Sequence, residues 1–293
     1  MKDVIIVATP DNMSAADELA QHLNVELAPI YVNQFPDGEI KIRATKAASR
    51  TIVFHRLDHP RGKLSPLVFA ASALRDLGAR EIVLVAPYLC YMRQDKAFET
   101  GEAVSQRVIA NLLSQWVDHI VTVEPHLHRT KNLASLFPEI KVTTLSAAPL
   151  LATLIGHSAS KSNTILIGPD VEAHSWTEKV AANADIPFVI LTKERYGDRN
   201  VEITISDSAE ISTKQAFIID DIVSSGATLC AAAAVLRQRG VSRIEALSVH
   251  ALCGDSDLKR IKDSGIARLQ STDSIPHQTN AISVIPMLAK ALL

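Results

Sequence analysis

With 293 residues, the chain exceeds the usual size of one domain, so we expect two domains of roughly 100–200 residues each. Apolar residues make up 47% and charged residues 21%, and a net charge of -2 argues against a basic surface for nucleic acid. Three cysteines far apart argue against a disulfide framework or a zinc cluster, and we expect buried small residues in a reducing, cytoplasmic protein. No membrane partner is expected, because the alanine-rich run LCAAAAVL is too short to span a bilayer.

Short runs rich in β-branched residues alternate with amphipathic stretches of ten or more residues along the chain. This alternation predicts an α/β fold of βα units, with mainly parallel sheets flanked by helices. The expected strands, in chain order, are VIIVA (4–8), TIVFH (51–55), EIVLVA (81–86), HIVTV (119–123), NTILIG (163–168), PFVIL (187–191), AFIID (216–220) and RIEALSV (243–249).

Two polar stretches stand beside the expected strands of the first half. FPDGE (35–39) is a turn sequence between two extended segments, and on its residues alone it predicts a plain β-hairpin. RQDK (93–96) follows the strand at 81–86, at the sheet edge where α/β proteins bind ligands, although polar loops after strands are ordinary. No G-x-x-x-x-G-K-[ST] motif occurs, so a bound nucleotide would depend on Arg and Lys side chains instead of a P-loop.

An internal repeat indicates that the two halves are copies of one α/β domain. FAASALRDLGAREIVLV (69–85) aligns with AAAAVLRQRGVSRIEAL (231–247) at a constant offset of 162 residues. Convergence is the alternative, since glycine at a helix C-terminus before a buried strand is a common device. We expect domains at 1–145 and 146–293, with the C-terminal NAISVIPMLAKALL packing back on the first domain.

The two copies differ just before the shared helix. The second half has IIDDIVSSGAT, where a strand ends in two carboxylates and five small residues lead into a helix. Backbone N–H groups and the helix N-terminus, with about half a positive charge, predict a phosphate cradle there. The two carboxylates would repel phosphate and suit the vicinal hydroxyls of a sugar, directly or through a divalent cation. The stretch therefore predicts a sugar-phosphate site, and a capped helix beside solvated aspartates is the alternative.

IIDDIVSSGAT resembles the phosphoribosyl-diphosphate-binding loop of the phosphoribosyltransferase superfamily. Further stretches occur in the order and spacing of the ribose-phosphate diphosphokinases, or PRPP synthetases, and RQDKAF with GEAVS resembles their shorter, archaeal-type class. These stretches are FPDGE (35–39), PYLCYMRQDKAF (87–98), GEAVS (101–105), VEPH (123–126), GPD (168–170), residues 193–195 and TDSIP (272–276). The resemblance implies two tandem phosphoribosyltransferase-like domains. It also implies that the diphosphate of ATP, as its magnesium complex, is transferred to O1 of ribose 5-phosphate, giving PRPP and AMP.

The same resemblance implies a role for each site residue and a homo-oligomer whose active site is shared between subunits. The residues implied for ATP binding, the first three of them from a neighbouring subunit, are Phe35, Asp37, Glu39, Arg93, Gln94 and Asp95. Those implied for ribose 5-phosphate are Asp220, Asp221, Ser224, Ser225, Gly226, Ala227 and Thr228. His126 and Asp170 are implied as Mg²⁺ ligands, and Lys193 and Arg195 as catalytic residues of a loop that closes over the substrates.

Two departures from the family pattern keep alternatives open. VEAHSW (171–176) stands where most members have a glycine-rich turn, and Glu194 lies where many relatives are basic. On composition alone, the segment with Lys193 and Arg195 is a solvated loop. The rival functions are a phosphoribosyltransferase that consumes PRPP, and a non-catalytic regulatory subunit that keeps the fold.

Overall fold

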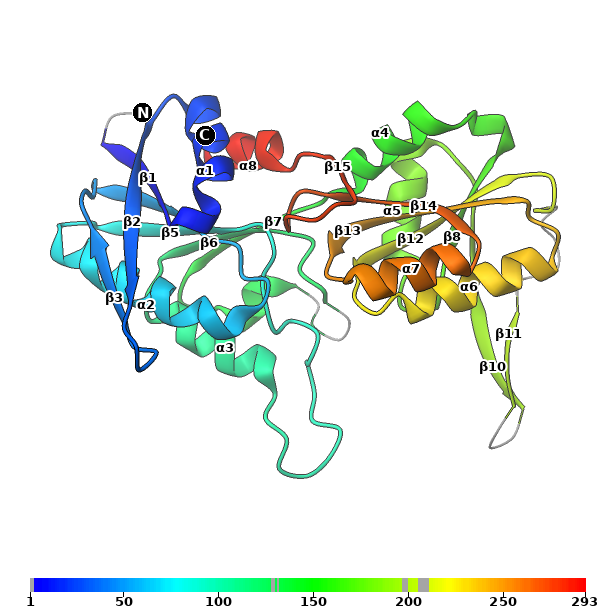
Figure 1. Ribbon diagram of the computed structural model, residues 1–293, viewed down its shortest axis with the longest axis horizontal. Helices are drawn as coiled ribbons and strands as arrows, with labels where there is room; N and C mark the ends of the chain where they lie inside the picture. Colours follow the sequence, from blue (N-terminus) through cyan, green and yellow to red (C-terminus); the bar gives the residue numbers. More distant parts are fainter. Residues whose placement is uncertain (1–2, 128–129, 131, 197–199, 205–210) are drawn as a thin grey trace. The chain divides into compact units, whose positions relative to one another are not determined.

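The computed structural model describes residues 3–127, 130, 132–196, 200–204 and 211–293 (Figure 1). By the packing of its backbone the chain divides into two compact units. Unit 1 comprises Met1–Leu145 and Val284–Leu293, and unit 2 comprises Ser146–Ser283. Within the described residues, no helix is both long enough and apolar enough to cross a membrane.

Unit 1 is built on a seven-stranded sheet in the order β3-β2-β1-β4-β5-β6-β7. Neighbouring strands are parallel except β2 and β3, which form an antiparallel hairpin. The strands are β1 (Val4–Ala8), β2 (Glu26–Gln34), β3 (Ile40–Ala44), β4 (Arg50–Phe54), β5 (Glu81–Ala86), β6 (His119–Val123) and β7 (Lys141–Leu145). β1, β4, β5 and β6 are buried along nearly their whole length, as expected for parallel strands covered on both faces.

Helices cover both faces of this sheet. They are α1 (Met13–Leu23), α2 (Leu64–Asp76), α3 (Ser105–Ser114) and α8 (Ile285–Leu292), with 3-10 turns η1 (Pro10–Asn12), η2 (Pro60–Gly62) and η3 (Leu133–Leu136). α2 and α3 lie on one face, and α1 and α8 on the other (Figure 1). α8 buries Ile285, Leu288 and Leu292 and contacts α1, which explains why the last helix belongs to unit 1.

Unit 2 contains a six-stranded, wholly parallel sheet in the order β15-β14-β13-β12-β8-β9, and a separate antiparallel hairpin of β10 and β11. The strands are β8 (Thr164–Gly168), β9 (Phe188–Ile190), β10 (Thr192–Tyr196), β11 (Asn200–Thr204), β12 (Gln215–Val223), β13 (Arg243–Ala251), β14 (Ile266–Thr272) and β15 (Asn280–Ile282). The helices are α4 (Ala148–Ser158), α5 (His174–Ala184), α6 (Ala227–Gln238) and α7 (Asp255–Asp263), with the 3-10 turn η4 (Lys161–Asn163).

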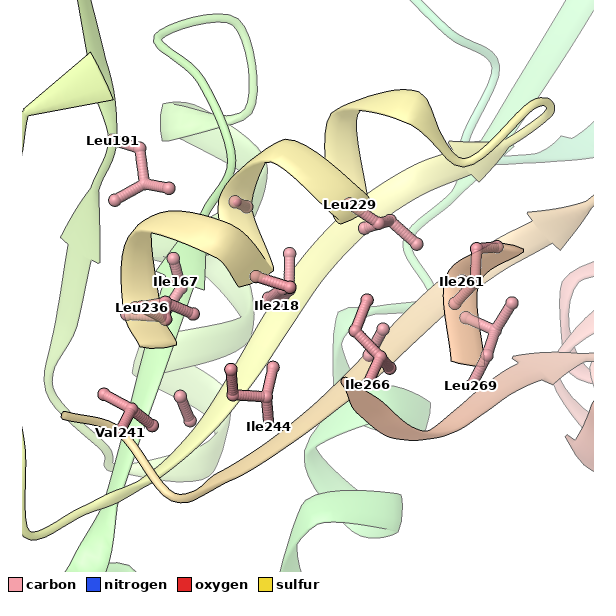
Figure 2. Packing of buried hydrophobic residues seen from close by; sticks show 14 of the residues in the cluster. Ile167, Leu191, Ile218, Leu229, Leu236, Val241, Ile244, Ile261, Ile266 and Leu269 are labelled. Carbon is pink, nitrogen blue, oxygen red and sulfur yellow. The ribbon is translucent and has the colours of Figure 1, made fainter. Parts of the chain in front are cut away.

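The core of unit 2 lies between its sheet and the helices α6 and α7. Figure 2 shows Leu229 and Leu236 of α6 facing Ile218 of β12 and Ile244 of β13. Each such side chain stabilises the fold by roughly 1.5–3 kcal/mol when fully buried. Alanine has the highest helix propensity, and the run of four alanines in α6 keeps the helix close to the sheet. This packing holds α6 against the sheet, with its first residue, Ala227, a few positions after the end of β12.

The expected α/β fold is confirmed, and every expected strand coincides with an observed one to within three residues at each end. One stretch differs from expectation. Lys193 and Arg195 were expected in a loop, but their backbone forms β10, where they pair with Ile203 and Val201 of β11. The polar sequence TKERY does not predict a strand, because most of the β-branched residues of this hairpin are in the partner strand NVEIT.

Candidate active site

An acidic pair stands on β12, at the carboxyl-end edge of the parallel sheet of unit 2. Asp220 and Asp221 are partly buried, and the Asp221 backbone N–H donates to Asp220 Oδ1 at 2.9 Å. Burial, the Asp221 carboxylate and the Asp170 carboxylate together raise the pKa of Asp220 well above its ordinary value. Because β8 is the direct neighbour of β12, Asp170 follows β8 at the same edge. The Asp221 and Asp170 carboxylates are therefore close enough to Asp220 to repel its charged form.

This edge is also the topological switch point of the sheet. The chain passes from β8 to β9 on one side, and β12 lies on the other side. Ligands of open α/β sheets bind in the crevice outside the carboxyl ends of the strands at such a point. Asp170 is held there by the turn before α5, where the Ala173 backbone N–H donates to Asp170 Oδ1 at 3.0 Å. The fold thus brings Asp170, Asp220 and Asp221 to a position suited to ligand binding.

The small-residue loop between β12 and α6 has the geometry expected of a phosphate cradle. Gly226 is the N-cap of α6 with φ +72°, a left-handed conformation that only glycine adopts readily. A Cβ atom at Gly226 would lie 2.5 Å from Ile261 Cδ1 of α7, so the buried Ile261 side chain would have to shift to admit any other residue. Ser225, Ala227 and Thr228 are exposed. The loop therefore offers first-turn N–H groups and two hydroxyls to an anion arriving from solvent.

Unit 1 carries a different pair at the equivalent place. Ile219 pairs with Leu247 in unit 2, and Phe54 pairs with Val85 in unit 1, where Val85 and Leu247 are repeat positions offset by 162. The residues that follow Phe54 are His55 and Arg56, so a basic pair replaces the acidic pair. Burial lowers the pKa of His55, whose Nε2 lies 3.0 Å from the Lys63 carbonyl oxygen. Unit 1 therefore lacks the carboxylates that suit sugar hydroxyls at this strand end.

The candidate ATP residues of unit 1 form two groups. Arg93, Gln94 and Asp95 follow β5, and the Ser105 hydroxyl and the Gln106 backbone N–H both bond to Gln94. The RQD stretch is thus tied to the N-terminus of α3. Asp95 lines a cavity of about 440 Å³. The other residues that line this cavity are Gln106, Arg107, Thr130, Asn132, Ser135 and Leu136.

Phe35, Asp37 and Glu39 form the second group, at the turn of the β2–β3 hairpin. The Phe35 backbone N–H donates to the Glu39 carbonyl at 2.8 Å, and Asp37 Oδ1 accepts from the Glu39 backbone N–H at 3.0 Å. Phe35 is 42% exposed, a high value for a large apolar ring in a turn held by its own hydrogen bonds. The hairpin therefore presents an aromatic ring and two carboxylates to solvent.

His126 lies in unit 1, three residues beyond β6, whereas Asp170 lies in unit 2. Within the described part of the chain, no three His, Cys, Asp or Glu side chains are close enough to form a ready metal site. Lys193 and Arg195 lie on β10, and residues 197–199, which follow β10 in the sequence, are outside the described residues.

Sequence reasoning missed Arg260, on α7. Its Nη2 donates to the Ser225 carbonyl at 2.6 Å and to Asp257 Oδ1 at 2.6 Å. Arg260 lies 35 residues after Ser225, and nothing in the local pattern of α7 indicates this contact.

Comparison with known proteins gives a consistent result over the full length. The model of the N-terminal domain of ribose phosphate pyrophosphokinase matches residues 4–116, and that of the phosphoribosyl transferase domain matches residues 143–282. Ribose-phosphate pyrophosphokinases of Methanopyrus kandleri and Methanothermobacter thermautotrophicus are 30% and 32% identical. The two matches cover 99% and 98% of this chain, and 98% and 99% of those proteins. The crystal structure of phosphoribosylpyrophosphate synthetase from Mycobacterium smegmatis has the same fold, with a TM-score of 0.85 at 23% identity, covering 99% of this chain and 98% of that one.

Proposed function

The chain belongs to the ribose-phosphate pyrophosphokinase family, and from this membership we propose its reaction and the roles of its residues. It is an enzyme that transfers the diphosphate of ATP to O1 of ribose 5-phosphate, giving PRPP and AMP. The observation that carries the proposal is the sheet edge of unit 2, where three carboxylates stand beside a phosphate loop. Neither element alone would select a phosphorylated sugar.

Charge decides how ribose 5-phosphate lies in this site. The 5-phosphate binds at the loop of residues 224–228, because the backbone N–H groups, the Ser225 and Thr228 hydroxyls and the α6 N-terminus all favour an anion. It cannot lie beside Asp220 and Asp221, whose carboxylates repel it. These two side chains accept hydrogen bonds from the ribose hydroxyls. The sugar therefore spans from the start of α6 to the end of β12.

The donor set also fits Mg²⁺. Carboxylate oxygens are its preferred protein ligands, and Mg²⁺ usually keeps several waters, so a complete set of protein ligands is not required. The raised pKa of Asp220 supports a cation here, because added positive charge would offset the burial and the Asp221 and Asp170 carboxylates that raise it. Asp170 and His126 are the residues that we propose would hold Mg²⁺ bound with ATP. Bound Mg²⁺ would supply neutralisation of the charge that develops on the diphosphate.

Positioning and charge neutralisation supply most of the catalysis in such a transfer. O1 of ribose forms a bond to the β-phosphorus while the bond from that phosphorus to the α,β-bridging oxygen breaks, and AMP leaves with that oxygen. The O1 proton passes to solvent, and no general base is needed. Lys193 and Arg195 stabilise the negative charge that shifts onto the leaving and equatorial oxygens.

The two units divide the substrates between them, with the domain boundary that we propose at residues 145 and 146 and with α8 returning to unit 1. Arg93, Gln94 and Asp95 contact ATP, and so does the hairpin of a neighbouring subunit, with Phe35 against the adenine and Asp37 and Glu39 near its amino group. The exposure of Phe35 supports this assignment, since an exposed ring on a rigid turn is available to another chain. The enzyme is then a homo-oligomer with shared sites, and its free cysteines support a cytoplasmic location.

Replacing Asp221 tests the sugar site directly. Asp221→Asn should raise the KM for ribose 5-phosphate or lower kcat/KM by about 10- to 150-fold, because a hydrogen bond to a charged group contributes roughly 1.5–3 kcal/mol. AMP formation from ATP, Mg²⁺ and ribose 5-phosphate is the readout. Asp263→Asn, an exposed aspartate at the end of α7, is the matched control and should behave as wild type. Kinetics of Asp221→Asn equal to those of the control would reject the assignment.

A further inference from the structure

Helix α7 supports the phosphate loop through two adjacent residues. Arg260 Nη2 donates to the Ser225 carbonyl oxygen at 2.6 Å, and Ile261 packs so closely against Gly226 that a Cβ atom there would require Ile261 to shift. Figure 1 shows α7 beside α6, the helix that the loop begins. Arg260 is itself held, because Asp257 Oδ1 accepts from the same nitrogen while Asp257 Oδ2 accepts from the Gly254 backbone N–H at 3.0 Å. The guanidinium is therefore anchored to the start of its own helix.

The contact with Ser225 fixes the direction of a second group. The carbonyl of Ser225 and the N–H of Gly226 belong to one peptide plane, and this peptide is trans. In a trans peptide the C=O and N–H bonds point in opposite directions. Because Arg260 binds the oxygen, the Gly226 N–H points away from α7. Arg260 thus determines that the N–H of this peptide, and not its C=O, points to the side of the loop away from α7.

This peptide is the one in the loop that most needs such a restraint. Gly226 has φ +72° and ψ 8°, and glycine adopts left-handed and right-handed backbone regions with similar ease. Rotation of the 225–226 peptide plane would exchange its N–H for its carbonyl oxygen. A phosphate beside the loop would then meet a partial negative charge where it had met a donor. One rotation would convert a favourable group into a repulsive one.

We propose that Arg260 is a positioning residue for ribose 5-phosphate, which keeps the Gly226 N–H directed at the 5-phosphate by holding the Ser225 carbonyl. This role rests on the proposed function, since it takes the loop as the phosphate site. Arg260 also places a positive charge next to the loop. Its side chain is 53% exposed, so solvent screens that charge, and the hydrogen bond to the carbonyl carries the larger part of the effect.

The test compares variants of two neighbouring cations on α7. Arg260→Met removes the donor and the charge, Arg260→Lys keeps the charge and one donor, and Lys259→Met removes an exposed charge from the same helix. Calorimetry measures binding of ribose 5-phosphate, and steady-state kinetics measure kcat and both KM values. We expect Arg260→Met to weaken ribose 5-phosphate binding by about 10- to 100-fold with the KM for ATP unchanged. Arg260→Lys should recover part of this loss, and Lys259→Met should match wild type.

The outcomes separate this role from the proposed function. If the Arg260→Met variant binds ribose 5-phosphate as tightly as the Lys259→Met variant does, the positioning role is overturned and the proposed function stands. Equal losses for both substrates with a lowered melting temperature also overturn it, because they describe a purely structural residue. If Arg260→Met does not fold, Arg260→Lys and Arg260→Gln, which retain a donor, must still show the selective loss. If the wild-type protein neither binds ribose 5-phosphate nor turns it over, the proposed function and this role are both overturned.

Discussion

At the scale of single residues, Lys193 is the proposed catalytic residue whose replacement we expect to change the rate most. During transfer, negative charge shifts onto the leaving oxygen, so a cation there stabilises the transition state more than the bound substrates. Lys193→Ala should therefore lower kcat by about 10³–10⁵ with much smaller changes in KM, by analogy with cationic residues in other phosphoryl-transfer enzymes. Steady-state kinetics decide this, with Lys179→Ala on the exposed face of α5 as the control. A kcat within about tenfold of wild type would remove Lys193 from the mechanism.

His119 makes a pH-dependent contribution to stability in unit 1. It is 2% exposed at the start of β6, where Nε2 lies 2.9 Å from the Thr143 hydroxyl. Burial, and then the charges of Lys141 and Arg50, lower the pKa of His119 from 6.5 to about 4. Since the folded pKa lies below the unfolded value, the neutral form favours the fold. Its contribution is complete above about pH 6.5 and is lost as the pH falls toward 4, by at most roughly 3 kcal/mol.

Denaturant unfolding between pH 7 and 4 checks this prediction. His119→Gln keeps a side-chain partner for Thr143 but cannot be charged, so its unfolding free energy should fall less steeply with acid than that of wild type. The difference between the two slopes isolates His119 from the other groups that titrate in this range. Parallel curves would show that His119 gains its proton without cost.

At the scale of elements, the β2–β3 hairpin is expected to serve a neighbouring subunit. Glu39 is exposed in a turn closed by backbone hydrogen bonds, so Glu39→Ala should leave the fold intact. Glu39→Ala and Asp221→Ala should each be inactive. Mixing them under conditions of subunit exchange should restore some turnover, because one site of a hybrid carries both intact residues. Exchange shown by mass spectrometry without returning activity would contradict the shared site.

Elements were predictable from sequence where the signal is local. β12, the loop at residues 224–228 and α6 follow from an apolar run, small residues and an alanine-rich helix within about 25 positions. β10 was not recognised, because its polar residues are stabilised by pairing with β11. The support of Ser225 by Arg260 depends on how α7 packs on α6, and packing of separate elements leaves no local pattern. Prediction therefore succeeded for strands and helices that one segment encodes, and it failed for contacts that depend on the packing of separate elements.

At the scale of the whole molecule, the repeat gives a reason why we propose the sugar site in only one unit. Both units share the strand–helix–strand core, but Asp220 and Asp221 in unit 2 stand where His55 and Arg56 stand in unit 1. In the proposed function, this difference would leave diol binding to the second unit, because the first unit has no carboxylate at the two equivalent positions. The offset of 162 residues was visible in the sequence. The equivalence of the pair Asp220 and Asp221 with the pair His55 and Arg56 could be recognised only from the strand registers in the structure.

Phosphorus-31 NMR of the wild-type reaction tests the central claim most directly. With ATP, Mg²⁺ and ribose 5-phosphate, direct diphosphate transfer predicts AMP and PRPP in equal amounts, with no ADP. Omission of ribose 5-phosphate should stop AMP formation. A phosphoribosyltransferase that consumes PRPP, or a regulatory subunit without activity, would leave ATP unchanged. ATP that stays intact with ribose 5-phosphate present, or its conversion to ADP and a sugar bisphosphate, would contradict diphosphate transfer by this chain.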